Sequence, residues 1–498
     1  MKQILLGLDI GSSSIKASLV DAESGRPVAS AQSPSEEMEM IAVQPGWAEQ
    51  HPDLWWKHLV IAVRAALKKA TLKGGDITAV GISYQMHGLV VVDANHKVLR
   101  PSIIWCDSRA VGIGQQASRA LGERYCLEHF LNSPGNFTAS KLKWVRDNEP
   151  AIFEKIDKIM LPGDYIAMRL TGEVVTTDTG LSEGIFWDYQ ERDISEKLLQ
   201  HYGFSRNILP SLVPVFGAQG AVTKKAAAEL GLEAGTKVSY RAGDQPNNAF
   251  SLNVLRPGET AATAGTSGVI YSVTDKNAFD PLSRVNTFIH VNNRPGHPSN
   301  GVLLCVNGTG ILNSWLRRNT GSAGTLPDYD KMNAMASDVP IGSDGLLMLP
   351  FGNGAERILE NRTINASLHG LDFNHHGQAH LFRAAQEGIV FALKYGFDVL
   401  KEMGLKSDVI RAGHTNMFLS PVFREAFVNT IGAPLELYNT DGATGAAIGA
   451  GLGAGIFDSV NEAFTGLTVK QFAAPEQKKR ELYQGAYLKW LALLDHGK

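Results

Sequence analysis

The sequence predicts an α/β protein made of two domains of similar design. The chain has 498 residues, and at ~150 residues per domain this length suits more than one domain. An apolar strand followed by a turn rich in glycine and hydroxyl groups opens the chain, and the same combination returns near residue 265. Segments with apolar residues at helical spacing accompany the strands in both halves. We therefore expect domains at residues 1–250 and 251–498.

In the first half, the apolar run Ile4–Leu8 ends at Asp9, and an alternating segment follows at 17–21. This pattern predicts a β-hairpin with a polar connecting turn. Residues 53–69 carry apolar side chains at helical spacing behind Pro52, which predicts an amphipathic helix. Strands are then expected at 77–83, at 89–93 and from 103, before a mostly helical stretch over 110–235.

In the second half, strand signals return over 236–275. Long helical patterns follow at 378–403 and 421–431, and a run of small residues spans 441–449. The second half therefore begins as the first does, with strands around a glycine and hydroxyl turn.

The charge balance excludes some functions. Lys and Arg number 47 against 50 Asp and Glu, for a formal net charge of -3 without a sustained block of either sign. This argues against a polybasic protein that binds nucleic acid or a membrane surface. The three cysteines are too few and too far apart for a disulfide framework or a cysteine zinc site. This cysteine usage predicts a cytoplasmic protein. No stretch approaches ~18 apolar residues, so we expect no membrane span.

Two turns predict phosphate binding. Within eight residues, the first combines Asp9, Gly11, Ser12, Ser13, Ser14 and Lys16, and the second contains Gly265, Thr266 and Ser267. A bound phosphate needs backbone N–H, hydroxyl and cationic partners, and its Mg²⁺ prefers oxygen ligands such as Asp. An ordinary serine-rich turn is the alternative for the first segment alone. Because the two turns stand at the starts of two similar halves, they together predict a nucleotide clamped between the domains. The chain has no Walker A motif and no protein-kinase glycine loop, which argues against those two classes.

Polar residues at the ends of predicted strands resemble a wall for a small polyol. Such a ligand needs carboxylates, amides, an arginine and an aromatic face. A packed core histidine remains the alternative for His87, and a capping aspartate the alternative for Asp244. The candidate substrate residues are Gln85, Met86, His87, Trp105, Asp107, Arg109, Asp244 and Gln245.

With these motifs, the chain resembles the FGGY family of carbohydrate kinases, within the actin, Hsp70 and sugar-kinase superfold. The two phosphate turns resemble the family's phosphate motifs, and Ser83–Gly88 is similar to the xylulokinase sugar motif S-G-Q-M-H-G. Segments 46–56, 141–148 and 368–387 also fit the family or its xylulokinase branch. The departures from the pattern are Tyr84 in place of a glycine, Gln245 in place of an asparagine, and Ala412–Thr415 in place of a glycine-rich adenosine loop.

The resemblance implies two ribonuclease-H-like domains flanking a deep cleft, with sugar mainly on the first and ATP mainly on the second. It implies transfer of phosphate from ATP to the terminal hydroxyl of a ketose, with D-xylulose preferred, Asp244 as general base and Asp9 orienting Mg²⁺. The implied nucleotide-binding residues are Gly11, Ser12, Ser13, Ser14, Lys16, Gly265, Thr266, Ser267, Gly310, Gly413 and Asn416.

Other functions stay open at this point. The substrate could be ribulose, fuculose, gluconate or glycerol, and Gln245 is the residue expected in glycerol kinases. An actin-like or Hsp70-like nucleotide switch would not need the polar wall. A catalytically silent sugar sensor would not need Asp244. We expect sugar and ATP as the partners, no nucleic acid or membrane partner, and a possible homodimer.

Overall fold

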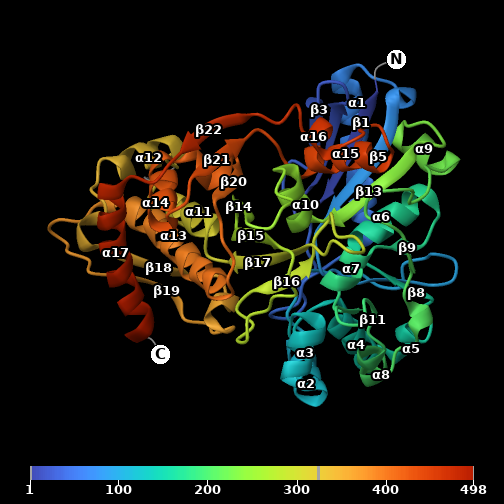
Figure 1. Ribbon diagram of the computed structural model, residues 1–498, viewed down its shortest axis with the longest axis horizontal. Helices are drawn as coiled ribbons and strands as arrows, with labels where there is room; N and C mark the ends of the chain where they lie inside the picture. The colour runs from blue at the N-terminus through green and yellow to red at the C-terminus, as the bar shows by residue number, and fades with distance from the viewer. Residues whose placement is uncertain (1–2, 322–325, 497–498) are drawn as a thin grey trace.

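The computed structural model describes residues 3–321 and 326–496, and it has two lobes, each built around a mixed sheet. In Figure 1 the first half of the chain forms the right-hand lobe, and most of the second half forms the left-hand lobe. The expected α/β class with two domains of similar design is confirmed.

The first sheet has the strand order β13-β5-β1-β2-β3. Strands β1, β2 and β3 form an antiparallel meander, while β5 and β13 lie parallel to β1. Their bounds are Ile4–Ile10 (β1), Ile15–Asp21 (β2), Arg26–Ser33 (β3), Ile77–Tyr84 (β5) and Lys237–Gly243 (β13). The predicted hairpin is therefore β1 with β2.

The second sheet repeats this arrangement in the order β16-β17-β15-β14-β20-β21-β22. Antiparallel β14, β15 and β17 correspond to the meander, and parallel β20 and β21 lie on the other side of β14. The bounds are Glu259–Ala264 (β14), Gly268–Thr274 (β15), Asn286–Ile289 (β16), Asn300–Val306 (β17), Val409–Gly413 (β20), Leu435–Tyr438 (β21) and Val469–Ala473 (β22). Each half thus places a turn between its first two strands, at the two predicted phosphate sites.

The helices agree with the predicted periodicity. The amphipathic segment near Pro52 is α1, which packs on β2 and β3, and the long pattern from 378 is α13. The helices are Pro52–Ala70 (α1), Val111–Leu121 (α2), Glu123–Phe130 (α3), Thr138–Asn148 (α4), Pro150–Phe153 (α5), Pro162–Thr171 (α6), Asp178–Glu183 (α7), Glu196–Tyr202 (α8), Lys224–Leu230 (α9), Asp244–Ser251 (α10), Gly310–Asn319 (α11), Tyr329–Ser337 (α12), Gln378–Glu402 (α13), Pro421–Ile431 (α14), Gly442–Gly453 (α15), Val460–Ala463 (α16) and Gln477–His496 (α17).

Short strands complete the fold. They are Glu49–Gln50 (β4), Val90–Val92 (β6), Ser102–Ile103 (β7), Lys158–Met160 (β8), Val175–Thr176 (β9), Trp187–Asp188 (β10), Asp193–Ile194 (β11), Ser211–Leu212 (β12), Leu347–Phe351 (β18) and Asn365–His369 (β19). The strand expected at 89–93 contains β6, whereas β7 ends at Ile103, so the strand expected from 103 onward does not form. Helices predominate over 110–235 as predicted, with short strands between them.

Helix α15 crosses back to the first sheet, where it packs on β1, β5 and β13, and Figure 1 shows it in red on the right-hand lobe. Glycines make this close approach possible, since a Cβ at Gly7 would fall 1.8 Å from the Ala443 carbonyl oxygen, and one at Gly81 would fall 2.0 Å from that of Ala446. The small-residue run at 441–449 therefore packs the second half of the chain against the first sheet.

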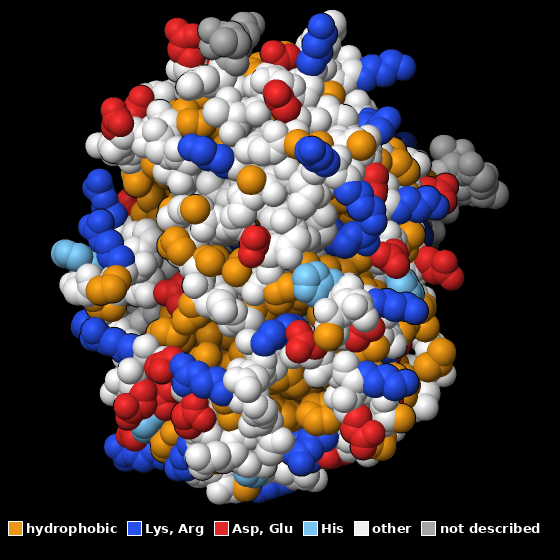
Figure 2. All heavy atoms as spheres, turned by 90° about the vertical axis from the view of Figure 1, so that its right-hand side faces the viewer, with side chains coloured by type: hydrophobic (Ala, Val, Ile, Leu, Met, Phe, Trp, Pro, Cys, Tyr) orange, Lys and Arg blue, Asp and Glu red, His pale blue; other side chains and the backbone are white. Residues whose placement is uncertain are grey.

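The surface carries charges of both signs. Figure 2 shows Lys and Arg side chains intermingled with Asp and Glu side chains on the face of the first lobe, with hydrophobic side chains between them. The three cysteines are all free thiols. In the parts of the chain that the structure describes, no helix has the length and apolar character to span a membrane.

Candidate active site

Asp9 lies at the end of β1, beside the first turn. Its Oδ1 accepts a hydrogen bond of 3.0 Å from the Ser83 hydroxyl of β5, and it pairs in register with Lys16 of β2. Burial raises the pKa of Asp9, the charge of Lys16 opposes this, and Asp441 adds to it. The site therefore holds a half-buried carboxylate next to a cation.

Backbone contacts hold the first turn. Gly11 N–H donates to the Ser14 carbonyl at 3.2 Å, and Met38 N–H donates to the Ser13 carbonyl at 2.8 Å. The Gln50 side chain donates to the Ser12 carbonyl at 2.7 Å. With these carbonyl groups satisfied, the hydroxyls of the turn are the groups suited to contact a phosphate.

Asp244 opens helix α10 directly after β13. Burial and the charge of Asp9 raise the pKa of Asp244 to about 7. Since β13 and β1 both neighbour β5, the ends of three parallel strands bring the two carboxylates together. A carboxylate with a pKa near neutrality is suited to general-base catalysis.

Several buried polar atoms beside Asp244 have no hydrogen-bond partner among the described residues. They include both polar atoms of the Gln85 side chain and the Oε1 atom of Gln245. Buried polar atoms in folded proteins are nearly always paired. Gln85 follows β5 and Gln245 follows the neighbouring parallel strand β13, so both lie at the same edge of the first sheet. Such amide groups are suited to a ligand rich in hydroxyl groups.

His87 has a left-handed backbone conformation, with φ of 61°. Its Nδ1 lies 2.9 Å from the Glu183 carbonyl oxygen, and because a carbonyl only accepts, Nδ1 carries the proton and Nε2 is an acceptor. Burial and the nearby Lys141 lower the pKa of His87 to about 3. The ring packs on Phe137 and on Phe288 of β16, with centroids 4.9 Å and 5.2 Å apart. A neutral histidine thus lies where the two halves meet.

Met86 and Trp105 line the same region. Met86 is buried, and its Cγ lies 2.6 Å from where a Cβ at Gly243 would stand. Trp105 is 46% exposed, and its Nε1 donates to the Ser12 hydroxyl at 3.2 Å. The predicted sugar residue Trp105 is therefore connected to the first phosphate turn.

Asp107 and Arg109, predicted as sugar-binding residues, form hydrogen bonds and ion pairs within the protein. Asp107 is fully buried, and its carboxylate accepts hydrogen bonds from the Ala48 N–H and from the Arg109 side chain. Arg109 also forms an ion pair of 2.6 Å with Glu49 and lies 3.7 Å from the centre of the Trp47 ring. Both side chains therefore bind each other and neighbouring residues, and these contacts stabilise the segment that carries Trp105.

A cavity of about 600 Å³ lies between the β14–β15 turn and the segment after β20. Of the predicted nucleotide residues, Gly265, Thr266, Gly310 and Asn416 line it. Glu37, from the first half of the chain, contributes to the same lining. Ser267 directly follows the lining residue Thr266, and Gly413 lies two residues before the lining residue Thr415. The size and lining fit a nucleotide.

Gly310 supports the second turn. Its N–H donates to the Gly265 carbonyl at 2.9 Å, and the next N–H, of Ile311, donates to the Thr266 carbonyl at 3.2 Å. A Cβ at Gly310 would fall 2.3 Å from the Gly265 carbonyl oxygen, so any larger residue would displace the turn. The N-terminus of α11 is thereby held against the turn, and helix N-termini favour anions.

Sequence reasoning missed Glu183 as part of the site. Glu183 ends α7, is fully buried, and its Oε1 has no partner among the described residues. Burial and the charge of Asp244 raise the pKa of Glu183 well above its ordinary value. No local pattern identifies it, because its environment comes from distant strands.

Lys141 and Tyr84 also belong to the surroundings of the site. Lys141 donates to the carbonyls of His87 and Ile104 at 2.8 Å and 2.9 Å, and burial lowers the pKa of Lys141 to about 8. Tyr84 is fully buried, with its ring against Gly163 of α6. Its ring therefore packs between β5 and α6 in the core of the first lobe.

Two family models cover nearly the whole chain. Residues 4–251 match the N-terminal domain of the FGGY family of carbohydrate kinases, and residues 260–455 match its C-terminal domain. The chain belongs to this family. This FGGY kinase is a phosphotransferase that acts on a carbohydrate, with ATP as the phosphate donor.

Similar proteins agree with this membership. The FGGY kinase is 30% identical to the xylulose kinase of Escherichia coli strain K12 over 486 residues, which covers 96% of each chain. The crystal structure of xylulose kinase from Rhodospirillum rubrum matches with a TM-score of 0.85 and 26% identity, over 99% of this chain and 98% of that one. Gluconate kinase from Lactobacillus acidophilus shares the fold, with a TM-score of 0.88 and 23% identity over 100% of this chain and 98% of that one.

Proposed function

We propose that this FGGY kinase phosphorylates the terminal hydroxyl of D-xylulose to give D-xylulose 5-phosphate. The observation that carries the proposal is that Asp244 and Gln245 follow β13 while Gln85 follows the neighbouring parallel strand β5. Both polar atoms of the Gln85 side chain and Oε1 of Gln245 are buried without a partner among the described residues. His87 offers a neutral ring acceptor beside them. Amides and a neutral imidazole suit an uncharged polyhydroxy substrate, and the full-length similarity to xylulose kinases supports the ketose.

In the proposed reaction, Asp244 accepts the proton of the attacking sugar hydroxyl. That oxygen bonds to the γ-phosphorus of ATP while the bond to the β-phosphate oxygen breaks, which releases ADP. Lys16 and the two glycine and hydroxyl turns would hold the phosphates, with Gly11, Ser12, Ser13 and Ser14 on one side and Gly265, Thr266 and Ser267 on the other. The protein's contribution is positioning and charge stabilisation.

We further propose Asp9 as the residue that holds Mg²⁺, directly or through water. A Cβ at position 442 would fall 2.9 Å from Asp9 Oδ2, and Gly442 leaves that space open beside the carboxylate. An oxygen donor of this kind fits Mg²⁺. The bound ion would supply charge stabilisation to the phosphates.

The free thiols support the expected cytoplasmic location.

Gluconate is the second candidate substrate, because cations lie beside the sugar motif. The charges of Lys141 and Arg357 both lower the pKa of His87, so both approach its ring. A carboxylate substrate would be attracted to them. Lys141 is already bound to two carbonyls, which leaves Arg357 as the side chain to test.

A coupled assay of ADP release with xylulose, ribulose, fuculose, gluconate and glycerol tests the proposal. We expect xylulose to give the highest kcat/KM and Asp244→Asn to abolish the signal. If no sugar stimulates ADP release, the proposed reaction is wrong. If gluconate is the best substrate and Arg357→Ala removes that preference, the second candidate is correct and the xylulose assignment fails.

A further inference from the structure

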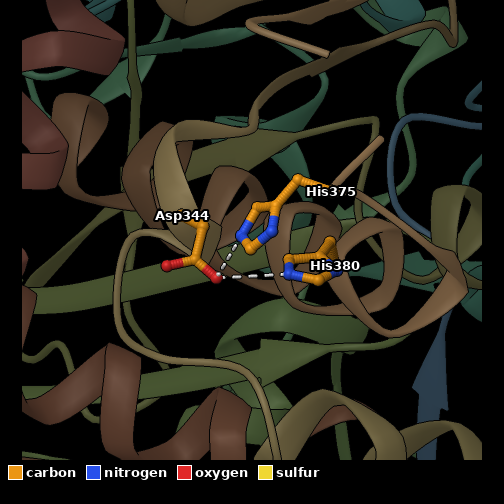
Figure 3. Close-up of side chains that lie close together, drawn as sticks. All are labelled: Asp344, His375 and His380. Carbon is orange, nitrogen blue, oxygen red and sulfur yellow. Dashed lines mark hydrogen bonds and ion pairs between the residues drawn. The ribbon is translucent and has the colours of Figure 1, made fainter. Parts of the chain in front are cut away.

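Three metal-ligating side chains meet away from the cleft. Among the residues that the structure describes, Asp344, His375 and His380 have ligand atoms that all lie within 4.8 Å of one another. The Nε2 atoms of the two histidines each lie 3.2 Å from the same oxygen, Asp344 Oδ2 (Figure 3). None of the three lines the nucleotide cavity.

The spacing of these atoms fits a tetrahedral ion. Bonds of about 2.0–2.1 Å from a tetrahedral ion to nitrogen and oxygen separate neighbouring ligand atoms by about 3.3 Å. The two distances of 3.2 Å match this edge length. Small side-chain adjustments would therefore place one ion in contact with all three residues.

Hydrogen bonds fix the backbone segments that carry Asp344 and His380. Asp344 lies in the short 3-10 turn Ser343–Gly345, and His380 lies in the first turn of α13. The buried Ser343 hydroxyl donates to the His380 carbonyl at 2.8 Å, and Gly342 N–H donates to the buried Glu387 carboxylate. These contacts join the turn to the helix on which His380 lies, so two of the ligands have a fixed relative position.

Exposure leaves room for an ion and for water. The His375 side chain is 59% exposed and that of Asp344 is 34% exposed, while that of His380 is 16% exposed. The site thus has one ligand largely in solvent and one packed against the protein. Its fourth position is open to water, as in zinc sites with three protein ligands.

We propose that Asp344, His375 and His380 form a surface site for Zn²⁺ or a similar late first-row divalent cation. Imidazole ligands favour such ions, whereas Mg²⁺ prefers oxygen ligands. Binding requires the lone pair of Nε2 on each histidine. For His380 the proton moves to Nδ1, which gives up its hydrogen bond of 3.1 Å from the Gly377 N–H. Without the ion, the Nε2–H groups of His375 and His380 point to the Asp344 carboxylate. The bound ion replaces these two protons and links the N-terminus of α13 to the 343–345 turn.

The test is zinc titration of the full chain, without a histidine tag and without nucleotide, by calorimetry. We expect a site that Asp344→Asn and His375→Ala each weaken at least about tenfold, since even outer-shell changes cost about 10–100-fold. Co²⁺ should give the intense visible bands of tetrahedral coordination in the native chain and not in these variants. Excess Mg²⁺ should not displace either ion.

Two control variants make the result decisive. His297→Ala removes an exposed histidine elsewhere and should leave zinc affinity unchanged. His376→Ala removes a neighbour whose Nε2 lies 3.4 Å from the Asp344 backbone oxygen, and it should have a smaller effect than His375→Ala. Zinc affinity that is equal in the native chain, Asp344→Asn and His375→Ala would overturn the proposal, as would a larger loss in His376→Ala. Because the readout needs no sugar or ATP, it is independent of the proposed kinase substrate.

Discussion

The carboxylate of Asp9 lies close enough to Asp244 to raise its pKa, and burial together with that charge brings the pKa of Asp244 to about 7. The two residues stand at the ends of β1 and β13, on either side of β5. Two carboxylates in one site with different environments can divide their roles. Asp9 is suited to bind a metal ion, and Asp244 is suited to accept a proton. The first two predictions follow from this division.

Replacement of Asp244 by asparagine should remove the general base and preserve the size of the side chain. Loss of a general base typically costs ~10²–10⁴ in rate, so we expect kcat to fall by at least ~10²-fold while ATP binding persists. Steady-state kinetics and calorimetry with an ATP analogue measure the two quantities. Retention of more than roughly a tenth of the native kcat would contradict the assignment.

The rate should depend on pH through Asp244. A base acts in its ionised form, so kcat/KM should rise as pH increases through about 7. A profile of kcat/KM from about pH 5 to about pH 9 checks this. A profile without a rise near neutral pH would contradict the assignment of Asp244 as the base.

Thr266→Val should separate phosphate binding from sugar binding. The substitution removes a hydroxyl from the β14–β15 turn and keeps the shape of the side chain. We expect a higher KM for ATP or a lower kcat, with little change in sugar affinity measured without nucleotide. Equal weakening of sugar binding in that measurement would mean that the turn is misassigned.

Glu183→Gln should stabilise the protein increasingly as pH rises. Because the folded-state pKa of Glu183 is raised above its unfolded value, its contribution is fully present below about 4.5 and is lost as pH increases. Glutamine carries no such proton, so the difference in Tm between the variant and the native chain should grow from pH 5 to pH 8. The exposed Glu191→Gln is the matched control and should show no trend. A constant difference for Glu183→Gln would mean that this carboxyl is ionised in the folded protein.

Ligands should close the cleft. Glu37 of the first half lines the nucleotide cavity of the second, and Phe288 of the second half packs on His87. Sugar should therefore tighten binding of an ATP analogue by the same factor by which the analogue tightens sugar binding. Small-angle scattering should show a smaller radius of gyration with both ligands than with neither. An unchanged radius together with unchanged analogue affinity would support a rigid cleft instead.

Much of the fold follows from local sequence patterns. The helix over Pro421–Ile431 has the predicted bounds, and the alternating residues after Asp9 form the predicted hairpin. Apolar periodicity and turn residues act over a few positions, so they are visible in the sequence. The two glycine and hydroxyl turns likewise indicated phosphate sites, because their chemistry lies within a few consecutive residues.

The tertiary structure alone decided which polar residues are free to bind a ligand. Asp107 and Arg109 have suitable chemistry for a sugar, yet they satisfy each other and their neighbours. Glu183 carries no local signal, yet it lies beside Asp244. Whether a polar side chain is free to bind a ligand depends on residues that are distant in sequence. Local sequence patterns cannot identify those residues.

The sequence by itself thus determined the repeated strand and turn design, the main helices and the positions of the two glycine and hydroxyl turns. Only the tertiary structure showed that α15 packs on the first sheet and that Asp9 lies near Asp244. It also showed that Asp344 lies close to His375 and His380. The physical reason is the range of the interactions. Backbone preferences and periodicity are set by neighbouring residues, whereas burial, desolvation and charge coupling arise only when separate segments pack together.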